Sequence, residues 1–126
     1  MMTPVKKKLL LAEDDKLLAS LLRFRLEKAG YEVFLAHDGR EVKLLLQNGM
    51  PDIIVSDIMM PYFSGIELVE YVREELGSRI PVIIISSAGN EENVLSAFEL
   101  GANDFISKPV SPSELLVRVG RELKKN

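Results

Sequence analysis

One stretch decides the fold: residues 52–61, which read DIIVSDIMMP. Its β-branched run, Ile53 to Val55, suits a strand that is buried on both faces of a sheet. The run leads to a carboxylate, Asp57, and Pro61 then breaks the extended structure. An ionisable group at the carboxyl end of a buried parallel strand lies in the crevice where open α/β sheets bind their ligands. Because an aspartate can also simply end a strand, the interpretation of Asp57 depends on the partners that the chain places beside it.

Length and composition indicate one globular domain. The chain has 126 residues, of which 47% are hydrophobic and 28% charged, and no apolar run approaches the ~20 residues that span a bilayer. Without cysteine the chain forms neither disulfides nor thiolate metal sites, which fits a cytoplasmic location. The net charge is −3 and the basic residues are scattered, so we expect neither a nucleic-acid-binding face nor a membrane-binding one.

Four more apolar segments read as strands, and they alternate with segments of helical periodicity. The predicted strands are 7–12, 31–36, 53–57, 82–85 and 104–107. The predicted apolar face of the first helix is Leu18, Leu21, Leu22, Leu26 and Ala29, and that of the fourth is Val94, Ala97 and Phe98. The last helix has a clear start, with Ser111 as N-cap, Pro112 at the first helical position and Glu114 completing a capping box.

Five strands alternating with five helices through short loops predict an α/β fold with a parallel sheet covered on both faces. Right-handed crossovers favour the flavodoxin-like, doubly wound strand order 2-1-3-4-5. In that order the first and third strands are neighbours. We expect one domain over residues 1–126, with its core at about 7–124 and no output domain in this chain. A stand-alone protein is favoured over a domain cut from a longer regulator.

Polar residues follow several of these strands at the same edge of the sheet. Glu13 and Asp14 follow the first strand, Asp57 ends the third, Ser87 ends the fourth and Lys108 ends the fifth. Three carboxylates this close need a cation between them, and hard oxygen ligands suit Mg²⁺ or Mn²⁺. A hydroxyl and an ammonium opposite them suit the oxygens of a phosphoryl group. The arrangement predicts an aspartate that acts as a nucleophile toward phosphorus and forms an aspartyl phosphate.

Each of these residues has an ordinary explanation when it is taken alone. Asp14 before a helix is more often a first-turn acid than a metal ligand, Ser87 is a common turn residue, and an isolated lysine such as Lys108 is usually a surface residue. The coincidence of these residue types at one sheet edge favours the functional interpretation. Asp104 is interpreted as a loop acid without a function.

With these residues in place, the chain resembles the receiver domain of bacterial two-component response regulators, from about Lys7 to Lys124. The matching segments are Leu11–Asp15, Asp52–Pro61 with Gly65, Pro81–Ala88 and Gly101–Pro109. Each segment is common alone, but the set in this order and spacing is highly specific.

The resemblance implies a role for each site residue. Asp57 matches the phosphoacceptor. Glu13 and Asp14 match the acidic pair that holds Mg²⁺ with Asp57, and the backbone carbonyl of Met59 matches a further ligand. The resemblance also implies that Ser87 is the hydroxyl that turns toward the phosphoryl group, that Lys108 pairs with that group, that Phe105 is the switch aromatic and that the Lys108–Pro109 bond is cis.

The chain departs from the family pattern at two places. Its loop after the phosphorylation site reads Met60–Gly65 (MPYFSG), where Met-Pro-x-Met-Asp-Gly is common, and Phe63 and Ser64 are expected to be tolerated there. Phe105 lacks the hydroxyl of the more usual tyrosine, which puts a switch that depends on that hydroxyl in doubt.

The resemblance implies a regulatory switch rather than an enzyme. A histidine kinase or phosphotransfer protein would dock near the first helix, where Leu17 and Phe24 lie off the inward face, and would phosphorylate Asp57. Phosphorylation would alter residues 90–124, the fourth helix, fifth strand and fifth helix, for a downstream protein target. The domain would be a monomer or a phosphorylation-dependent dimer.

Four other classes of protein are weaker matches. A flavodoxin-like FMN carrier needs a phosphate-binding loop where Glu13 and Asp14 stand, and an aspartyl phosphatase needs a carboxylate where Met59 stands. A P-loop nucleotidase needs a glycine-rich Lys-Ser/Thr loop that the sequence lacks. The strongest rival is a phosphorylation-independent pseudo-receiver that only binds partners, and the presence of every phosphorylation residue disfavours it.

Overall fold

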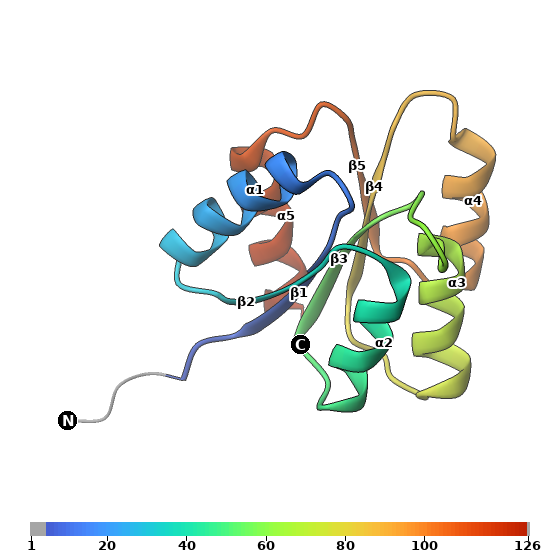
Figure 1. The fold of residues 1–126 in the computed structure, drawn as a ribbon, viewed down its shortest axis with the longest axis horizontal. Coiled ribbons are helices and arrows are strands. Elements are labelled where there is room, and N and C mark those ends of the chain that lie inside the picture. Colours follow the sequence, from blue (N-terminus) through green and yellow to red (C-terminus); the bar gives the residue numbers. More distant parts are fainter. Residues whose placement is uncertain (1–4, 126) are drawn as a thin grey trace.

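The protein folds into a five-stranded parallel sheet in the order β2-β1-β3-β4-β5, as seen in a computed structural model that describes residues 5–125 (Figure 1). The strands are β1 (Lys8–Ala12), β2 (Glu32–Ala36), β3 (Ile53–Asp57), β4 (Val82–Ser86) and β5 (Asp104–Ser107). This confirms the predicted flavodoxin-like topology. The long runs of Ile and Val suit β3 and β4, which lie inside the sheet and are buried at every position.

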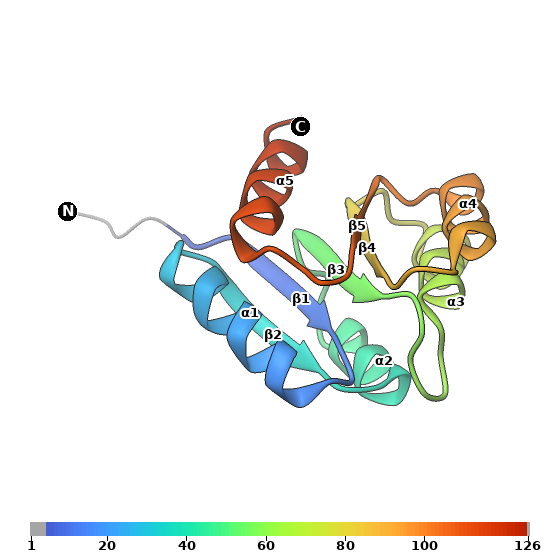
Figure 2. The ribbon, with the colours of Figure 1, turned by 90° about the horizontal axis from the view of Figure 1, so that it is seen from above.

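Five helices cover the two faces of the sheet. They are α1 (Lys16–Lys28), α2 (Gly39–Gln47), α3 (Gly65–Glu70, continued by the π-helical turn η1, Tyr71–Glu75), α4 (Glu91–Leu100) and α5 (Pro112–Lys124). The view from above shows α1 and α5 on one face and α2, α3 and α4 on the other (Figure 2). None of the helices within residues 5–125 is long and apolar enough to cross a bilayer.

Successive residues of each central strand point into different cores, because side chains alternate across a sheet. Ile54 and Ile84 pack into the core under α2, α3 and α4, whereas Ile53, Ile83 and Ile85 pack into the core under α1 and α5. The carboxyl ends of the strands therefore emerge together between two complete cores. Their positions are fixed by the packing of the strands rather than by the loops.

The helix starts differ in part from the prediction. Asp15 caps α1 by accepting hydrogen bonds from two backbone amides of its first turn. Ser64 and Glu67 form a complete capping box at α3, which the sequence-based prediction does not include. At α5 the predicted box is only half formed: the Ser111 hydroxyl accepts from the Glu114 amide, but the Glu114 carboxylate pairs with an arginine one turn later.

Three residues predicted to face the core are exposed. The buried residues of α1 are Ala19, Leu22 and Leu26. Leu21 is 50% exposed, and Ala29, at the end of the helix, is also exposed. In α4, Val94 and Ala97 are buried as predicted, but Phe98 is 40% exposed. The periodicity of short helices leaves such boundary positions open, because one residue step rotates a side chain by only about 100° around the helix.

Asp104 was interpreted as a loop acid, and the structure corrects this. It is the first residue of β5, is 9% exposed, and accepts hydrogen bonds from Arg118 at 2.7 Å and Arg121 at 2.9 Å. Arg118 also donates to the backbone carbonyl of Phe105. The two arginines come from α5, so this cluster ties that helix to the edge strand.

The β3–α3 loop is packed on α2 rather than free in solvent. Phe63 is 7% exposed, and a Cβ atom added to Gly39 at the start of α2 would lie 1.8 Å from the Phe63 Cβ. The Gly39 amide also donates to the carbonyl of Pro61 at 3.2 Å. The aromatic residue at position 63 therefore depends on a glycine in the facing helix, a coupling that lies beyond local sequence patterns.

Candidate functional site

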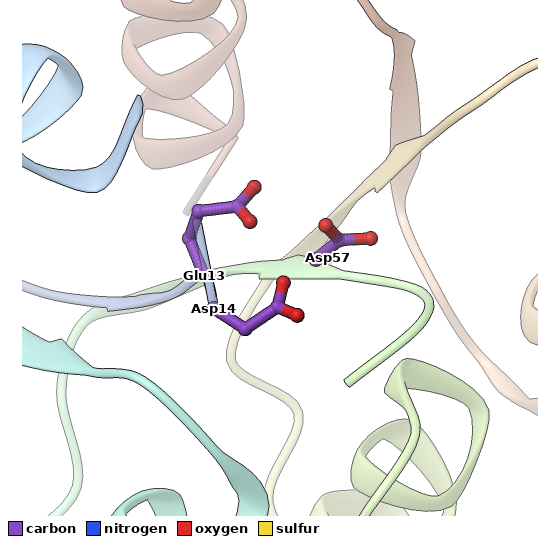
Figure 3. Close-up of side chains that lie close together, drawn as sticks. All are labelled: Glu13, Asp14 and Asp57. Carbon is purple, nitrogen blue, oxygen red and sulfur yellow. The ribbon is translucent and has the colours of Figure 1, made fainter. Parts of the chain in front are cut away.

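Three carboxylates meet where β1 and β3 end. Ala12 of β1 is in register with Ser56 of β3, which brings Glu13 and Asp14 beside Asp57. One oxygen from each carboxylate lies within 4.8 Å of the others (Figure 3). Glu13 and Asp57 are buried and Asp14 is exposed, so the cluster is open on one side only.

Lys108 supplies the positive charge of the site from the end of β5. Its ammonium donates to Asp57 Oδ2 at 2.6 Å and lies 3.2 Å from Glu13 Oε1. Its own amide donates to the Ser86 carbonyl, and its peptide bond to Pro109 is cis, as the resemblance implies. Although burial alone would lower the pKa of Lys108, the hydrogen bond and negative charge of Asp57 raise it above its usual value.

Glu13 is the most unusual residue of the cluster because it is completely buried. Its Oε2 accepts a hydrogen bond from the Asp15 amide at 3.0 Å. Its Oε1 has no hydrogen-bond partner among residues 5–125, although the Lys108 ammonium lies at ion-pair distance. Burial is the main reason that the pKa of Glu13 rises to about 7, and the nearby Asp57 charge adds to this.

These residues fit a hard divalent cation. Three carboxylates in one cluster, one of them with a buried oxygen that lacks a hydrogen bond, present a donor set of hard oxygens without nitrogen or sulfur. Such a set suits Mg²⁺ or Mn²⁺, and a bound cation would relieve both the repulsion between the carboxylates and the missing bond at Glu13.

Asp57 is held in place by the turn that follows it. Its Oδ1 accepts from the Met59 amide at 3.1 Å, and its side chain is 5% exposed. The Gly65 amide donates to the Ile58 carbonyl at 2.9 Å, which joins the start of α3 to the end of β3. Met59 is 57% exposed, beside the cluster rather than beneath it.

Gly65 lies so close to β3 that no side chain fits there. A Cβ atom at this position would lie 2.8 Å from both the Asp57 carbonyl oxygen and the Ile58 Cα. We expect Gly65→Ala to lower the free energy of unfolding by about 2 kcal/mol, because the contacted atoms are backbone and must shift. Urea denaturation measures the loss.

Gly120→Ala is the matched control for this prediction. Gly120 lies inside α5, and a Cβ atom there would have no heavy atom within 4 Å. We expect this change to stabilise the protein by ~0.5–1 kcal/mol, because alanine is the better helix former. Equal stability of the two variants would contradict the close approach of Gly65 to β3.

The fourth strand runs through Ser86, one residue beyond the predicted range 82–85, so Ser86 rather than Ser87 stands at the strand end. Ser86 is the last residue of β4 and is 5% exposed, whereas Ser87 lies beyond the strand and is exposed. Ser86 is in register with Ser107, next to Lys108, and its hydroxyl donates to the Ser87 carbonyl at 3.1 Å. The prediction that Ser87 ends the strand is therefore wrong. Counting the strand through its first polar residue would have found Ser86.

Comparison with known proteins decides the family. The model of the response regulator receiver domain matches residues 9–120. The chain belongs to the receiver domain family. Its fold is also that of solved receivers: it is 36% identical to the receiver domain of a Francisella response regulator, with a TM-score of 0.87 over 95% of this chain and 98% of that one.

Two further structures agree. A chemotaxis response regulator of Vibrio cholerae is 30% identical, with a TM-score of 0.86 over 94% of this chain and 99% of that one. A CheY-like receiver domain protein of Methanospirillum hungatei is 28% identical, with a TM-score of 0.90 over 96% of both chains. Family membership makes this chain a phosphorylation-based regulatory switch.

A groove lies beside the receiver site, between α4 and β5. It has a volume of about 460 Å³ and is lined by Ser86, Ser87, Ala88, Glu91, Val94, Leu95, Phe98, Phe105, Ser107 and Lys108. Phe105 is 39% exposed and packs edge-on against Phe98, with ring centroids 6.1 Å apart. Ser86, Ser87 and Phe105 therefore border the same space.

One residue near the site was not singled out from the sequence. His37, the only histidine, follows β2, and its Nδ1 lies 3.3 Å from the backbone carbonyl of Glu13. Its amide donates to the Glu41 carboxylate of α2. His37 thus joins the loop after β1 to the start of α2, a role for which its sequence context gives no signal.

Proposed function

We propose that this receiver domain accepts a phosphoryl group on Asp57 from a histidine kinase or phosphotransfer protein, in a Mg²⁺-dependent step. The observation that carries the proposal is the position of Asp57, whose carboxylate lies between the Lys108 ammonium and the acidic pair at the end of β1. Once Asp57 is phosphorylated, the surface formed by α4, β5 and α5 would change and bind a downstream protein target. We place this activity in the cytoplasm.

The proposed metal ligands are the carboxylates of Glu13, Asp14 and Asp57 and the backbone carbonyl of Met59, with Glu13 acting mainly through water. The cation would be Mg²⁺, with Mn²⁺ as a possible substitute. When bound, it supplies positive charge that offsets the carboxylates and the phosphoryl oxygens. Support comes from the clustered carboxylates and from the buried Glu13 oxygen without a hydrogen bond.

The proposed reaction needs little beyond positioning and charge. A carboxylate oxygen of Asp57 forms a bond to phosphorus while the phosphorus–nitrogen bond of the donor phosphohistidine breaks, and the imidazole leaves with the bonding electron pair. An ionised carboxylate needs no general base to act as a nucleophile. Lys108, which contacts Asp57 before the reaction, would pair with the added phosphoryl oxygens.

We propose that Ser86, rather than the Ser87 of the initial prediction, turns its hydroxyl toward the phosphoryl group, after which Phe105 moves inward. Ser86 is the buried residue at the strand end, and it borders the groove that Phe105 also borders. We expect Ser86→Ala to accept the phosphoryl group but to lose most of the response at β5. Ser87→Ala should respond like the wild type.

Amide resonances of residues 104–107, recorded with and without phosphorylation, measure this response. Both variants remove one hydroxyl from neighbouring positions, so each controls for the other. A wild-type response in Ser86→Ala together with a lost response in Ser87→Ala would return the role to Ser87.

The proposed docking site for the phosphodonor is the outer face of α1. Leu17 is 83% exposed and Phe24 is 62% exposed on this helix, which begins directly after the acidic cluster. The helix is therefore close to Asp57 and offers an apolar contact. Leu17→Asp should slow transfer from a cognate kinase without changing uptake from a small-molecule donor.

Intact mass after incubation with acetyl phosphate tests the proposed function. With Mg²⁺ we expect the protein to gain one phosphoryl group, and with a chelator in place of Mg²⁺ we expect almost none. No gain in the presence of Mg²⁺ would contradict the proposal and would favour a receiver that binds partners without phosphorylation.

A further inference from the structure

The helix beside the groove is strongly acidic. α4 carries Glu91, Glu92 and Glu99 and has no lysine or arginine. All three glutamates are exposed, and none forms an ion pair within residues 5–125. Unlike the charges in the phosphorylation site, these charges therefore remain available to a partner.

The groove itself is largely apolar beside Glu91, the one of these acids that lines it. Leu95 of α4 is 62% exposed, and it lies with Phe98 and the β5 residue Phe105 in the lining of the groove. Two aromatic rings and a leucine that are partly exposed side by side are the kind of contact on which protein interfaces depend. Glu91 borders the same groove, so the apolar floor and the acidic rim form one surface.

The basic residues on the other side of β5 do not offset the acidic rim. Arg118 and Arg121 of α5 both pair with Asp104, and Arg118 also pairs with Glu114. Two guanidinium groups thus face two carboxylates, which leaves this cluster close to neutral. On the α4 side of the groove, the charge without an ion-pair partner within residues 5–125 is that of Glu91 and its neighbour Glu92.

We infer that the partner of this groove is a helical protein segment with an apolar stripe flanked by lysine or arginine. The apolar stripe would cover Leu95, Phe98 and Phe105, and the flanking cations would face the acidic side of α4, beginning at Glu91, which lines the groove. Charge complementarity selects this occupant, because an acidic segment or a nucleic acid would meet like charge at the rim. This segment would belong to the downstream target of the proposed function, and only on that function rests the expectation that phosphorylation changes the affinity of the groove for it.

Two synthetic helical peptides of ~18 residues, about five turns, are the probes for this inference. They share one leucine stripe and differ only in their flanks, which are lysine in one and glutamate in the other. Fluorescence anisotropy measures their binding to the whole protein, before and after treatment with acetyl phosphate and Mg²⁺. Intact mass records phosphoryl uptake in the same samples.

Three protein variants accompany the wild type. The first replaces Glu91, Glu92 and Glu99 of α4 by lysine. The matched control replaces Glu70, Glu74 and Glu75, exposed residues of α3 and η1, by lysine, and so changes the net charge equally on a surface outside the groove. The third, Phe98→Ala, removes one aromatic ring from the groove and leaves every charge in place.

We expect the lysine peptide to bind the wild type at least about tenfold more tightly than the glutamate peptide, and less tightly as salt increases. The α4 triple variant should lose about tenfold in affinity, whereas the α3 control should stay within about twofold of the wild type. Phe98→Ala should weaken binding at every salt concentration.

Equal binding of the two peptides, or an equal loss in the α4 and α3 variants, would overturn the inference. Phosphoryl uptake without charge-selective binding would also overturn it while leaving the proposed function intact. Charge-selective binding without phosphoryl uptake would instead contradict the proposed function and leave the docking surface standing.

Discussion

Replacing Asp57 by asparagine is expected to abolish phosphoryl uptake from acetyl phosphate. The amide is neutral and cannot form the acyl phosphate, while its shape still fills the position between the turn and Lys108. The Met59 amide can still donate to the side-chain oxygen, so the fold should be retained. Intact mass after incubation with the donor and Mg²⁺ should show only the unmodified protein, and circular dichroism should match the wild type.

Asp52→Asn is the matched control for the loss of one carboxylate. Asp52 lies just before β3, at the opposite end of that strand from Asp57, where its Oδ2 accepts from the Lys8 amide at 2.7 Å. The Asp52→Asn protein should gain a phosphoryl group to the same extent as the wild type. A phosphoryl group gained by the Asp57→Asn protein at the wild-type rate would show that another residue is the acceptor.

The second large effect is the pH dependence of stability in the metal-free protein. Burial raises the pKa of Glu13 from 4.5 to about 7, so the folded state binds more protons than the unfolded state between these values. The free energy of unfolding should therefore fall as the pH rises through this window, by on the order of 3 kcal/mol from this residue. Below pH 4.5 Glu13 is protonated in both the folded and the unfolded state, so this residue no longer makes the free energy of unfolding depend on pH.

Glu13→Gln should remove this dependence. The amide does not titrate, so the variant should gain stability relative to the wild type as the pH rises from 5 to 8 in chelator. Urea denaturation at each pH measures the difference. Glu70→Gln, a change at an exposed α3 residue, should keep the wild-type slope. Parallel curves for the wild type and Glu13→Gln would contradict the raised pKa.

Excess Mg²⁺ should reverse the loss of stability in the wild type. A cation that binds the folded protein, and binds its carboxylates only when they are deprotonated, stabilises the folded state most at higher pH. Glu13→Gln should gain less from the same Mg²⁺ concentration. The comparison separates the metal contribution from the titration without any measurement of phosphorylation.

The sheet edge that carries the site was predictable from local patterns. The β-branched run that ends in Asp57 and the alternation of strands with helices restrict the topology, and the topology alone brings the acids after β1 beside Asp57. Lys108 follows the last strand directly, so its place at the same edge also follows from strand order. These predictions depend on backbone connectivity, which sequence periodicity reports well.

The remaining features depend on contacts between distant segments. Whether Ser86 or Ser87 borders the site depends on where β4 ends, and a single-residue shift exchanges a buried position for an exposed one. The burial of Asp104 requires two arginines from α5, and the fit of Phe63 requires a glycine in α2. Neither pairing has a signature in its own stretch of sequence.

The most direct test of the proposed function is to locate the phosphoryl group chemically. Borohydride reduces an aspartyl phosphate to homoserine but leaves a phosphoserine unchanged. After treatment with acetyl phosphate, Mg²⁺ and then borohydride, peptide mass analysis should find homoserine at position 57. A phosphoryl group that survives reduction on Ser86 or Ser87, or homoserine at position 14 instead, would contradict Asp57 as the acceptor.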